Sequence, residues 1–541
     1  MAFWRWSAGL VLVGAAVIWS CGKGSDGNPG TGGTGVVTPP DAGQPPPPPP
    51  PDAGTDGGIT DAGTTDGGTV WVPPPPVDFP SPAPAGWSFY GPQNGGPHDV
   101  FGVSADQAGN IWVAGGEDGL FFMRAGTTTF QRFTMDDGLR PYGYMPDGSD
   151  PIGPKFLKVI SVAGGPANTV FVGYEGRNRS VKDDCEGNWD GPNPDPSIYK
   201  SGDADRVTVD AAGKLTVVHY DIFSGPNVVG NEPRGREKIC HVVRIVWNAA
   251  TSDLWFGGNH GYVWADPNYA GDPKCNGQIG CSGLREHGHP GFNGINDAGG
   301  CCDFVTGDYR GVAVDPATGD VWFGGINRTT KLHWGETSGN KEGRFDAADF
   351  FTEAHDTGPA SQPPPSVPPC PAAPCYLANR IDVWPDIMGE VRFDSAQHRF
   401  VEYDPTRAEQ QPADLVFGIA ALPNTAFVGS GYLGLKQLAA DGTVVADLTS
   451  RLASRFVGAV AADPSDQSIW VGNRFGGAAD RLQGAATTHY SLDVFGPLAN
   501  SGIEDIQIAL KPGQPATSRQ VLFGFRESQT TAGFVAVYSG N

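Results

Sequence analysis

Residues 311–325 have the sequence Gly-Val-Ala-Val-Asp-Pro-Ala-Thr-Gly-Asp-Val-Trp-Phe-Gly-Gly. An alternating apolar strand comes first, then a tight turn built on Asp-Pro and Gly-Asp, then a second strand that ends in an aromatic residue and glycines. The pattern recurs, with clear copies at 103–114, 245–257 and 460–472 and weaker copies that end at 169–173, 425–429 and 521–524. Seven copies of one hairpin predict a repeat architecture.

The copy nearest the N-terminus extends into a unit of four strands, predicted at about 99–105, 110–114, 119–124 and 129–134. Asp137-Gly138-Leu139 follows the fourth strand. This order of hairpin, Gly-Leu strand, final strand and Asp-Gly-Leu resembles the two-component-regulator propeller repeat of sensor ectodomains and related β-propellers. The resemblance covers about residues 86–541. It implies a β-propeller, a fold that serves many unrelated functions.

We therefore expect an all-β fold over residues 86–541, a seven-bladed β-propeller with loop insertions. The last blade offers only three strands, so the separate strand pattern at Trp87–Tyr90 is predicted to supply the fourth and close the ring. An eighth blade stays open as an alternative at the 336–397 insert, where 380–384 has a strand pattern. The later blades are predicted at about 156–221, 240–288, 309–403, 414–447, 456–494 and 502–538.

A membrane anchor is predicted at the N-terminus. Arg5 precedes an apolar run at residues 8–19, which is short for a membrane span but suits a signal-peptide core. Val17-Ile18-Trp19-Ser20-Cys21 resembles a bacterial lipobox. The resemblance implies a signal peptide at 1–20, acylation of Cys21 and, with Gly22 next, sorting to the outer membrane. We expect a lipid-anchored, extracytoplasmic protein at the outer membrane or cell surface.

Residues 21–85 predict a disordered linker between this anchor and the propeller. Gly/Thr-rich sequence gives way to seven prolines at 45–51 and then to Asp-Ala-Gly and Asp-Gly-Gly repeats. Polyproline is extended, and Asp/Gly repeats are flexible and repel one another. At roughly 3 Å per residue, the linker could place the domain on the order of 100 Å from the membrane.

The negative net charge of the chain argues against a nucleic-acid partner. The formal net charge is −23, whereas a nucleic-acid-binding protein needs a basic face that displaces counterions. We expect no nucleic-acid partner, and we expect a monomer that meets the membrane through its lipid.

Eight cysteines remain after Cys21, and an even number in an exported chain predicts disulfides. Cys275 with Cys281 and Cys370 with Cys375 are near enough in sequence to close small loops, while the other pairings stay open. His287 and His289 lie near the first of these pairs, but no metal-binding motif frames them, so disulfides are favoured over a metal site. The predicted disulfide cysteines are Cys185, Cys240, Cys275, Cys281, Cys301, Cys302, Cys370 and Cys375.

Candidate ligand-binding residues follow the second strand of several blades. In a four-stranded blade, the connections after the second and fourth strands open on one mouth of the propeller. Arginine suits bidentate capture of carboxylate or phosphate, so a ring of arginines there predicts an anion site. The alternative is that these polar residues only occupy turns beside glycine. The candidates are Arg177, His260, Arg328, Arg474 and Arg526.

The sequence contains no Gly-x-Ser-x-Gly, no phosphate-binding Gly-x-x-x-x-Gly-Lys and no Cys-x-x-Cys-His haem motif. We therefore predict a non-enzymatic, cofactor-free binding module for an anionic glycan or peptide. The alternative is a propeller enzyme of the lyase or lactonase kind, with His260 and Glu175 near the axis.

The lipid anchor can be tested by Cys21→Ser. We expect the variant to leave the membrane fraction with an unchanged melting temperature, because the linker separates anchor from domain. Cell fractionation and thermal unfolding measure the two effects. A variant that still sediments with membranes would contradict lipidation at Cys21 as the anchor.

Overall fold

The computed structural model divides the chain into two units, residues 1–52 and 53–541, and describes residues of the second unit only. No helix among these residues is long and apolar enough to cross a membrane. The described residues are 75–144, 149–150, 155–176, 202–222, 241–258, 261–271, 284–288, 309–325, 328–337, 340–344, 350–352, 391–394, 399–402, 410–412, 416–431, 434–474, 478–495, 501–510, 518–528 and 531–540.

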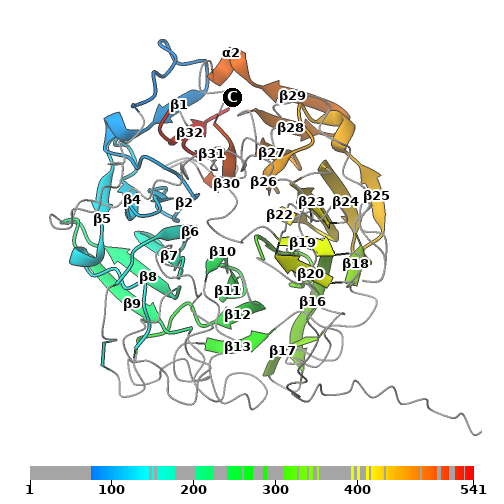
Figure 1. Ribbon diagram of the computed structural model, residues 1–541, viewed down its shortest axis with the longest axis horizontal. Coiled ribbons are helices and arrows are strands. Elements are labelled where there is room, and N and C mark those ends of the chain that lie inside the picture. Colours follow the sequence, from blue (N-terminus) through cyan, green and yellow to red (C-terminus); the bar gives the residue numbers. More distant parts are fainter. Residues whose placement is uncertain are drawn as a thin grey trace, which may run out of the picture. The chain divides into compact units, whose positions relative to one another are not determined.

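Seven antiparallel sheets form a ring of blades (Figure 1). Blade 1 holds β2 (Gly102–Ala105), β3 (Ile111–Ala114), β4 (Leu120–Met123) and β5 (Gln131–Phe133). Blade 2 holds β6 (Val159–Gly164), β7 (Thr169–Tyr174), β8 (Ala204–Val209) and β9 (Leu215–Tyr220). Blade 3 holds β10 (Val242–Asn248), β11 (Asp253–Gly258), β12 (Gly261–Ala265) and β13 (Leu284–Gly288).

The later blades repeat this order. Blade 4 holds β14 (Gly311–Val314), β15 (Val321–Gly324), β16 (Arg328–Thr337), β17 (Asn340–Arg344) and β18 (Phe350–Thr352). Blade 5 holds β22 (Val416–Leu422), β23 (Thr425–Ser430), β24 (Gly434–Ala439) and β25 (Val444–Asp447). Blade 6 holds β26 (Val457–Ala462), β27 (Ile469–Asn473), β28 (Ala479–Gln483) and β29 (Ala486–Tyr490).

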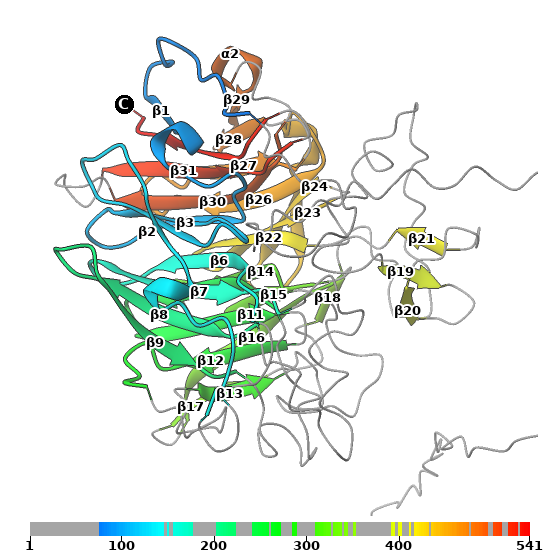
Figure 2. The same ribbon diagram turned by 60° about the vertical axis from the view of Figure 1, so that its left-hand side comes forward.

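The first strand of each blade faces the centre of the ring. The series β2, β6, β10, β14, β22 and β26 runs from neighbour to neighbour and reaches blade 7, whose β30 (Ile503–Leu510) lies beside β2 again. Figure 2 shows the sheets of blades 7, 1 and 2 stacked one on another. The prediction of a closed seven-bladed propeller is confirmed.

The repeated hairpin owes its shape to one aspartate and one tryptophan. Asp106, Asp315 and Asp463 each accept a hydrogen bond from the backbone N two residues on, at 2.8 Å, which stabilises the turn. In blade 1 the Nε1 of Trp112 also donates to Asp106, at 3.0 Å. Trp112 and Trp322 are fully buried, each in a core cluster shared with the next blade. The motif therefore fixes both the hairpin and the packing between blades.

The N-terminal strand β1 (Trp87–Tyr90) completes blade 7, which also holds β31 (Arg519–Phe525) and β32 (Phe534–Tyr538). It pairs with β32 in antiparallel register from Trp87 opposite Tyr538 to Tyr90 opposite Val535. The Trp87 ring packs 4.9 Å from that of Tyr538 and 5.1 Å from that of Phe495, between centroids. The predicted closure by the N-terminal strand is confirmed.

Blade 4 is shorter than the predicted 309–403. The long strand β16 pairs with β18 at residues 328–330 and with β17 at residues 333–337, so the blade ends at Thr352. Strands β19 (Val391–Asp394), β20 (Arg399–Glu402) and β21 (Gln410–Pro412) form a separate small sheet. The ring passes from β14 to β22, so this sheet is not an eighth blade. The strand pattern predicted at 380–384 lies outside the described residues.

Ring closure can be tested at Trp87. Trp87→Ala should lower the free energy of unfolding by about 3–5 kcal/mol, because it removes a buried aromatic side chain that joins β1 to the rest of blade 7. Ser88→Ala, at the neighbouring and more exposed position of β1, should cost less than about 0.5 kcal/mol. Chemical denaturation measures both changes. Equal effects of the two substitutions would contradict the closing role of β1.

Candidate functional site

The end of the second strand and the start of the first strand lie together at one mouth of the propeller. Backbone hydrogen bonds join them within a blade: the N of Arg474, after β27, donates to the O of Phe456, before β26, at 2.8 Å. The N of Arg526, after β31, likewise donates to the O of Gly502, before β30, at 2.8 Å. Charged residues at both kinds of strand end therefore meet at this mouth.

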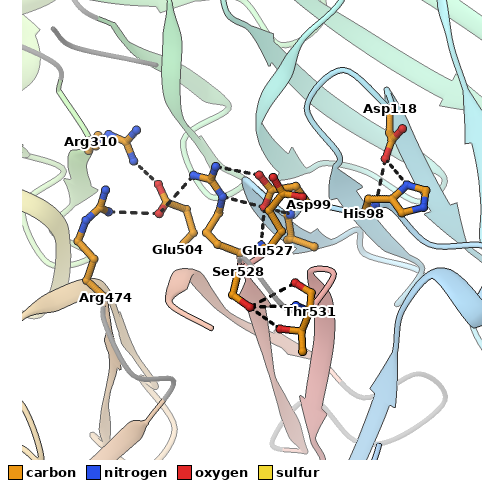
Figure 3. Close-up of polar contacts among 11 residues, drawn as sticks. His98, Asp99, Asp118, Arg310, Arg474, Glu504, Glu527, Ser528 and Thr531 are labelled. Carbon is orange, nitrogen blue, oxygen red and sulfur yellow. Dashed lines mark hydrogen bonds and ion pairs between the residues drawn. The ribbon is translucent and has the colours of Figure 1, made fainter. Parts of the chain in front are cut away.

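Seven charged side chains from five blades gather there, and we name them the axial cluster; Figure 3 shows the part of it around Glu504 and Asp99. Two arginines follow second strands, and the remaining members precede or occupy the first part of inner strands. The cluster thus sets four guanidinium groups against three carboxylates. Its members are Asp99, Arg244, Arg310, Arg474, Glu504, Asp505 and Arg526.

Glu504 of β30 is the centre of the axial cluster. Its Oε1 accepts from Arg310, its Oε2 accepts from Nη1 of Arg474 at 3.2 Å, and Nη1 of Arg526 lies 3.9 Å away. Burial would raise the pKa of Glu504, but the three guanidinium groups lower it to about 2. Glu504 is therefore ionised at any physiological pH.

Asp99 joins blade 1 to blade 7 through Arg526. The Nε and Nη2 of Arg526 each donate to one carboxylate oxygen at 2.8 Å, a bidentate pair, and the backbone N of Glu527 adds a third bond of 2.8 Å. Burial would lower the pKa of Arg526, but Asp99 and Glu504 raise it overall. The guanidinium also lies 3.9 Å from the Phe101 ring centroid. These contacts hold the side chain in one position.

Arg244 and Asp505 extend the axial cluster across the ring. The Nη1 of Arg244, in blade 3, donates to Asp505 of blade 7 at 2.8 Å. The other carboxylate oxygen of Asp505 accepts from the backbone N of Val103 in blade 1 at 3.0 Å. Blades that are not neighbours are thereby joined through their side chains.

A small cavity lies among the side chains of the axial cluster. The cavity between them is lined by Ser161, Arg244, Arg310, Glu504 and Asp505, among others, and has a volume of about 10 Å³. Such a space holds about one water molecule.

A second group of charged residues lies at the seam between blades 7 and 1. The Nδ1 and backbone N of His98 both donate to Oδ2 of Asp118 at 3.0 Å, and this bond raises the pKa of His98. Burial would raise the pKa of Asp118, but the His98 contacts lower it. Burial and the nearby charge of Asp99 raise the pKa of Glu527 to about 8. Glu527 is therefore largely protonated at neutral pH.

The predicted ligand-binding residues are only partly described. Arg474 and Arg526 lie in the axial cluster, with 7% and 9% of their surface exposed, bound to Glu504 and Asp99. Arg328 begins β16, but its side chain is not described, and Arg177 and His260 lie outside the described residues, as do Cys21 and the eight predicted disulfide cysteines. The binding role of all five residues stays a prediction.

Two features of the site went unpredicted. Glu175, considered near the axis for the enzyme alternative, pairs with buried Lys158 at 2.9 Å, a partner that the sequence did not suggest. The carboxylates of the axial cluster were also missed, although Ile503-Glu504-Asp505-Ile506 places two charges inside an apolar strand. Charged side chains at buried strand positions require partners of opposite charge, so this pattern could have predicted an ion-pair cluster near the axis.

The described residues contain no group of three or more His, Cys, Asp or Glu side chains placed to hold a metal ion.

No protein-family model and no curated protein matches the chain. Solved structures that resemble it include a chain of a mitotic checkpoint complex, 11% identical over 86% of this chain and 97% of that one, with a TM-score of 0.41. YCF48 bound to a D1 peptide is 11% identical over 86% and 100%, with a TM-score of 0.40. An aldose sugar dehydrogenase from Streptomyces coelicolor, in its PQQ-bound form, is 11% identical over 84% and 99%, with a TM-score of 0.33. At these levels of similarity the matches say nothing about function.

The closing role of the axial cluster can be tested with Arg526→Met. This change leaves the Asp99 carboxylate buried without its arginine, so unfolding should become easier by about 3–5 kcal/mol. Arg481→Met is the matched control, because the Arg481–Asp466 pair is partly exposed and should contribute less than about 1 kcal/mol. Urea denaturation measures both. Similar losses for the two variants would contradict a special role for the axial pair.

Proposed function

We propose that the chain is a non-enzymatic binding module, lipid-anchored at Cys21 on the cell surface, whose mouth binds an acidic polysaccharide through Arg474 and Arg526. It needs no cofactor in this role. The observation that carries the proposal is the axial cluster, in which four guanidinium groups face three carboxylates at one mouth. One positive charge is in excess among these residues, on a chain whose net charge is −23. An anion at the mouth would neutralise this excess.

The small size of the cavity within the axial cluster supports binding over catalysis. A propeller lyase or lactonase needs room for its substrate, and the described residues leave only about 10 Å³ between Arg244, Arg310 and Glu504. A ligand must therefore lie across the mouth instead of entering the ring. An extended polymer meets this requirement.

Two tyrosines support a glycan over an acidic peptide. Tyr142 and Tyr144 are half-buried, and the guanidinium carbon of Arg140 lies 4.5 Å and 3.6 Å from their ring centroids. They belong to the connection from the fourth strand of blade 1 to the first strand of blade 2, which opens on the same mouth as the axial cluster. Tyrosine faces pack well against the C–H face of a sugar ring, whereas Arg140 itself is already paired with Asp150 at 2.8 Å.

Binding can be tested with polygalacturonate and the full-length Cys21→Ser protein at two salt concentrations. Arg474→Gln should weaken binding at least tenfold, because it removes one guanidinium from the mouth, and higher salt should weaken wild-type binding. Arg481→Gln, whose partner Asp466 lies in a turn on the opposite face, should bind like wild type. Calorimetry measures affinity, and thermal unfolding verifies that each variant is folded.

Two results would contradict the proposal. Binding that Arg474→Gln leaves unchanged would exclude the mouth as the site. Consumption of the polysaccharide, seen as new reducing ends or unsaturated products, would instead favour the lyase alternative.

A further inference from the structure

A groove lies in the seam between blades 5 and 6, which are neighbours in the ring (Figure 1). We name it the seam groove; its volume is about 540 Å³, within the range of ligand-binding clefts. Three prolines on its edge, Pro316, Pro423 and Pro464, belong to turns that follow first strands. The seam groove therefore lies toward the face opposite the mouth and is distinct from the axial cluster.

The seam groove exists because blade 5 departs from the packing of other blades. Phe427 of β23 stands where four other blades have a tryptophan that packs on the next blade. In blade 4, Lys331 lies opposite this tryptophan and donates to the O of Ala440 in blade 5. In blade 5 the opposite residue is Gln437, which is shorter and makes no hydrogen bond to any described residue. The four tryptophans are Trp112, Trp255, Trp322 and Trp470.

The floor of the seam groove is apolar. The buried side chains of Phe427, Ile469 and Leu482 line it, and the half-buried Leu422 and Leu448 add apolar walls. All five belong to one hydrophobic cluster that both blades share. Covering such a surface with apolar groups of a ligand is favourable.

Arg451 supplies the positive charge of the seam groove. Its Nε donates to Oγ1 of Thr487 at 3.2 Å and its Nη2 donates to the O of Ala486 at 2.7 Å, which fixes the guanidinium. Among the described residues, its Nη1 has no hydrogen-bond partner and the guanidinium has no carboxylate partner. Asp466, the other charged residue of the lining, is paired with Arg481 at 2.6 Å. The seam groove thus offers one guanidinium group to a carboxylate.

The amide of Gln437 indicates which kind of carboxylate ligand fits. This half-buried side chain lines the seam groove, so a ligand that covers it must replace the hydrogen bonds that its amide makes with water. The alkyl chain of a fatty acid cannot do so. A peptide backbone presents both N–H and C=O groups, which favours a peptide.

We propose that the seam groove binds an extended peptide in which apolar side chains flank an aspartate or glutamate. The apolar side chains cover Phe427 and its neighbours, the acidic side chain pairs with Nη1 of Arg451, and the peptide backbone bonds to Gln437. The inference does not rest on the proposed function, because the seam groove and the mouth lie on opposite faces.

The test uses an array of acetylated, amidated heptapeptides whose three central positions combine leucine, phenylalanine, serine, glutamate and lysine. The full-length Cys21→Ser protein should bind members that join apolar residues to glutamate, and lysine in place of that glutamate should abolish binding. With the tightest glutamate peptide, Arg451→Gln should weaken binding about tenfold, because a charge-assisted hydrogen bond is lost. Arg124→Gln is the matched control, since Arg124 also donates to a backbone O, that of Asp210, across the seam of blades 1 and 2. It should bind like wild type.

Phe427→Trp separates loss of the site from loss of the fold. It restores the tryptophan of the other four blades, and the larger ring should occupy part of the seam groove. We expect peptide binding at least tenfold weaker, with a melting temperature no lower than that of wild type. Calorimetry and thermal unfolding measure the two effects. Should the melting temperature fall, Arg451→Gln, at a half-buried position, decides instead.

Three results would overturn the proposal: no array member that binds, equal binding of glutamate and lysine peptides, or full affinity in a folded Phe427→Trp protein. Binding of laurate in place of peptides would assign the seam groove to a lipid and would overturn it as well. Polygalacturonate binding is measured on the same variants and should stay unchanged, because neither substitution touches the mouth. Failure at the seam groove therefore leaves the proposed function intact.

Discussion

A single buried carboxylate, Glu504, joins parts of the ring that are far apart in the chain. It receives Arg310 from blade 4, Arg474 from blade 6 and Arg526 from blade 7. A carboxylate in such a place is costly to desolvate, and only several well-placed cations can compensate for that cost. Because each arginine depends on the position of its own blade, the contacts at Glu504 form together only when the blades occupy their places around the axis.

The ring is closed by two contacts, one at the rim inside blade 7 and one near the axis between blades 7 and 1. At the rim, β1 pairs with β32 through backbone hydrogen bonds and buried aromatic rings. Near the axis, Arg526 pairs with Asp99 in blade 1. Glycine also permits a close approach between blades 6 and 7, because a Cβ on Gly502 would lie 2.0 Å from the carbonyl O of Arg474. The contact at the rim stabilises the closed ring by burying apolar side chains. The ion pair near the axis forms only when the inner strands lie in one arrangement.

The fold could be predicted because its signals are local. In the copies at 103–114, 311–325 and 460–472 the aspartate and the tryptophan are six or seven residues apart, as in Asp106 and Trp112, so turn and packing appear in one short stretch. Blade 4 was less predictable, because β16 divides its pairing between β17 and β18, and no short window shows that division. The candidate site was likewise predictable only where its signals are local. Strand order placed Arg474 and Arg526 at one mouth, but Asp99 and Arg526 are 427 positions apart, and nothing local pairs them.

The same arginines that hold the ring together limit how a ligand could use them. Glu504, with a pKa of about 2, is bound too firmly for a sugar carboxylate to displace it, so an anion must approach from outside the cluster. The binding free energy of the anion at a single mouth is then small, about that of one exposed ion pair. Strong attachment would have to come from many weak contacts at once. Under the proposed function, a polymer that repeats its carboxylates and meets many tethered copies would supply this multivalency. The proposed flexible linker suits such binding, because each mouth can reach its own segment of the polymer.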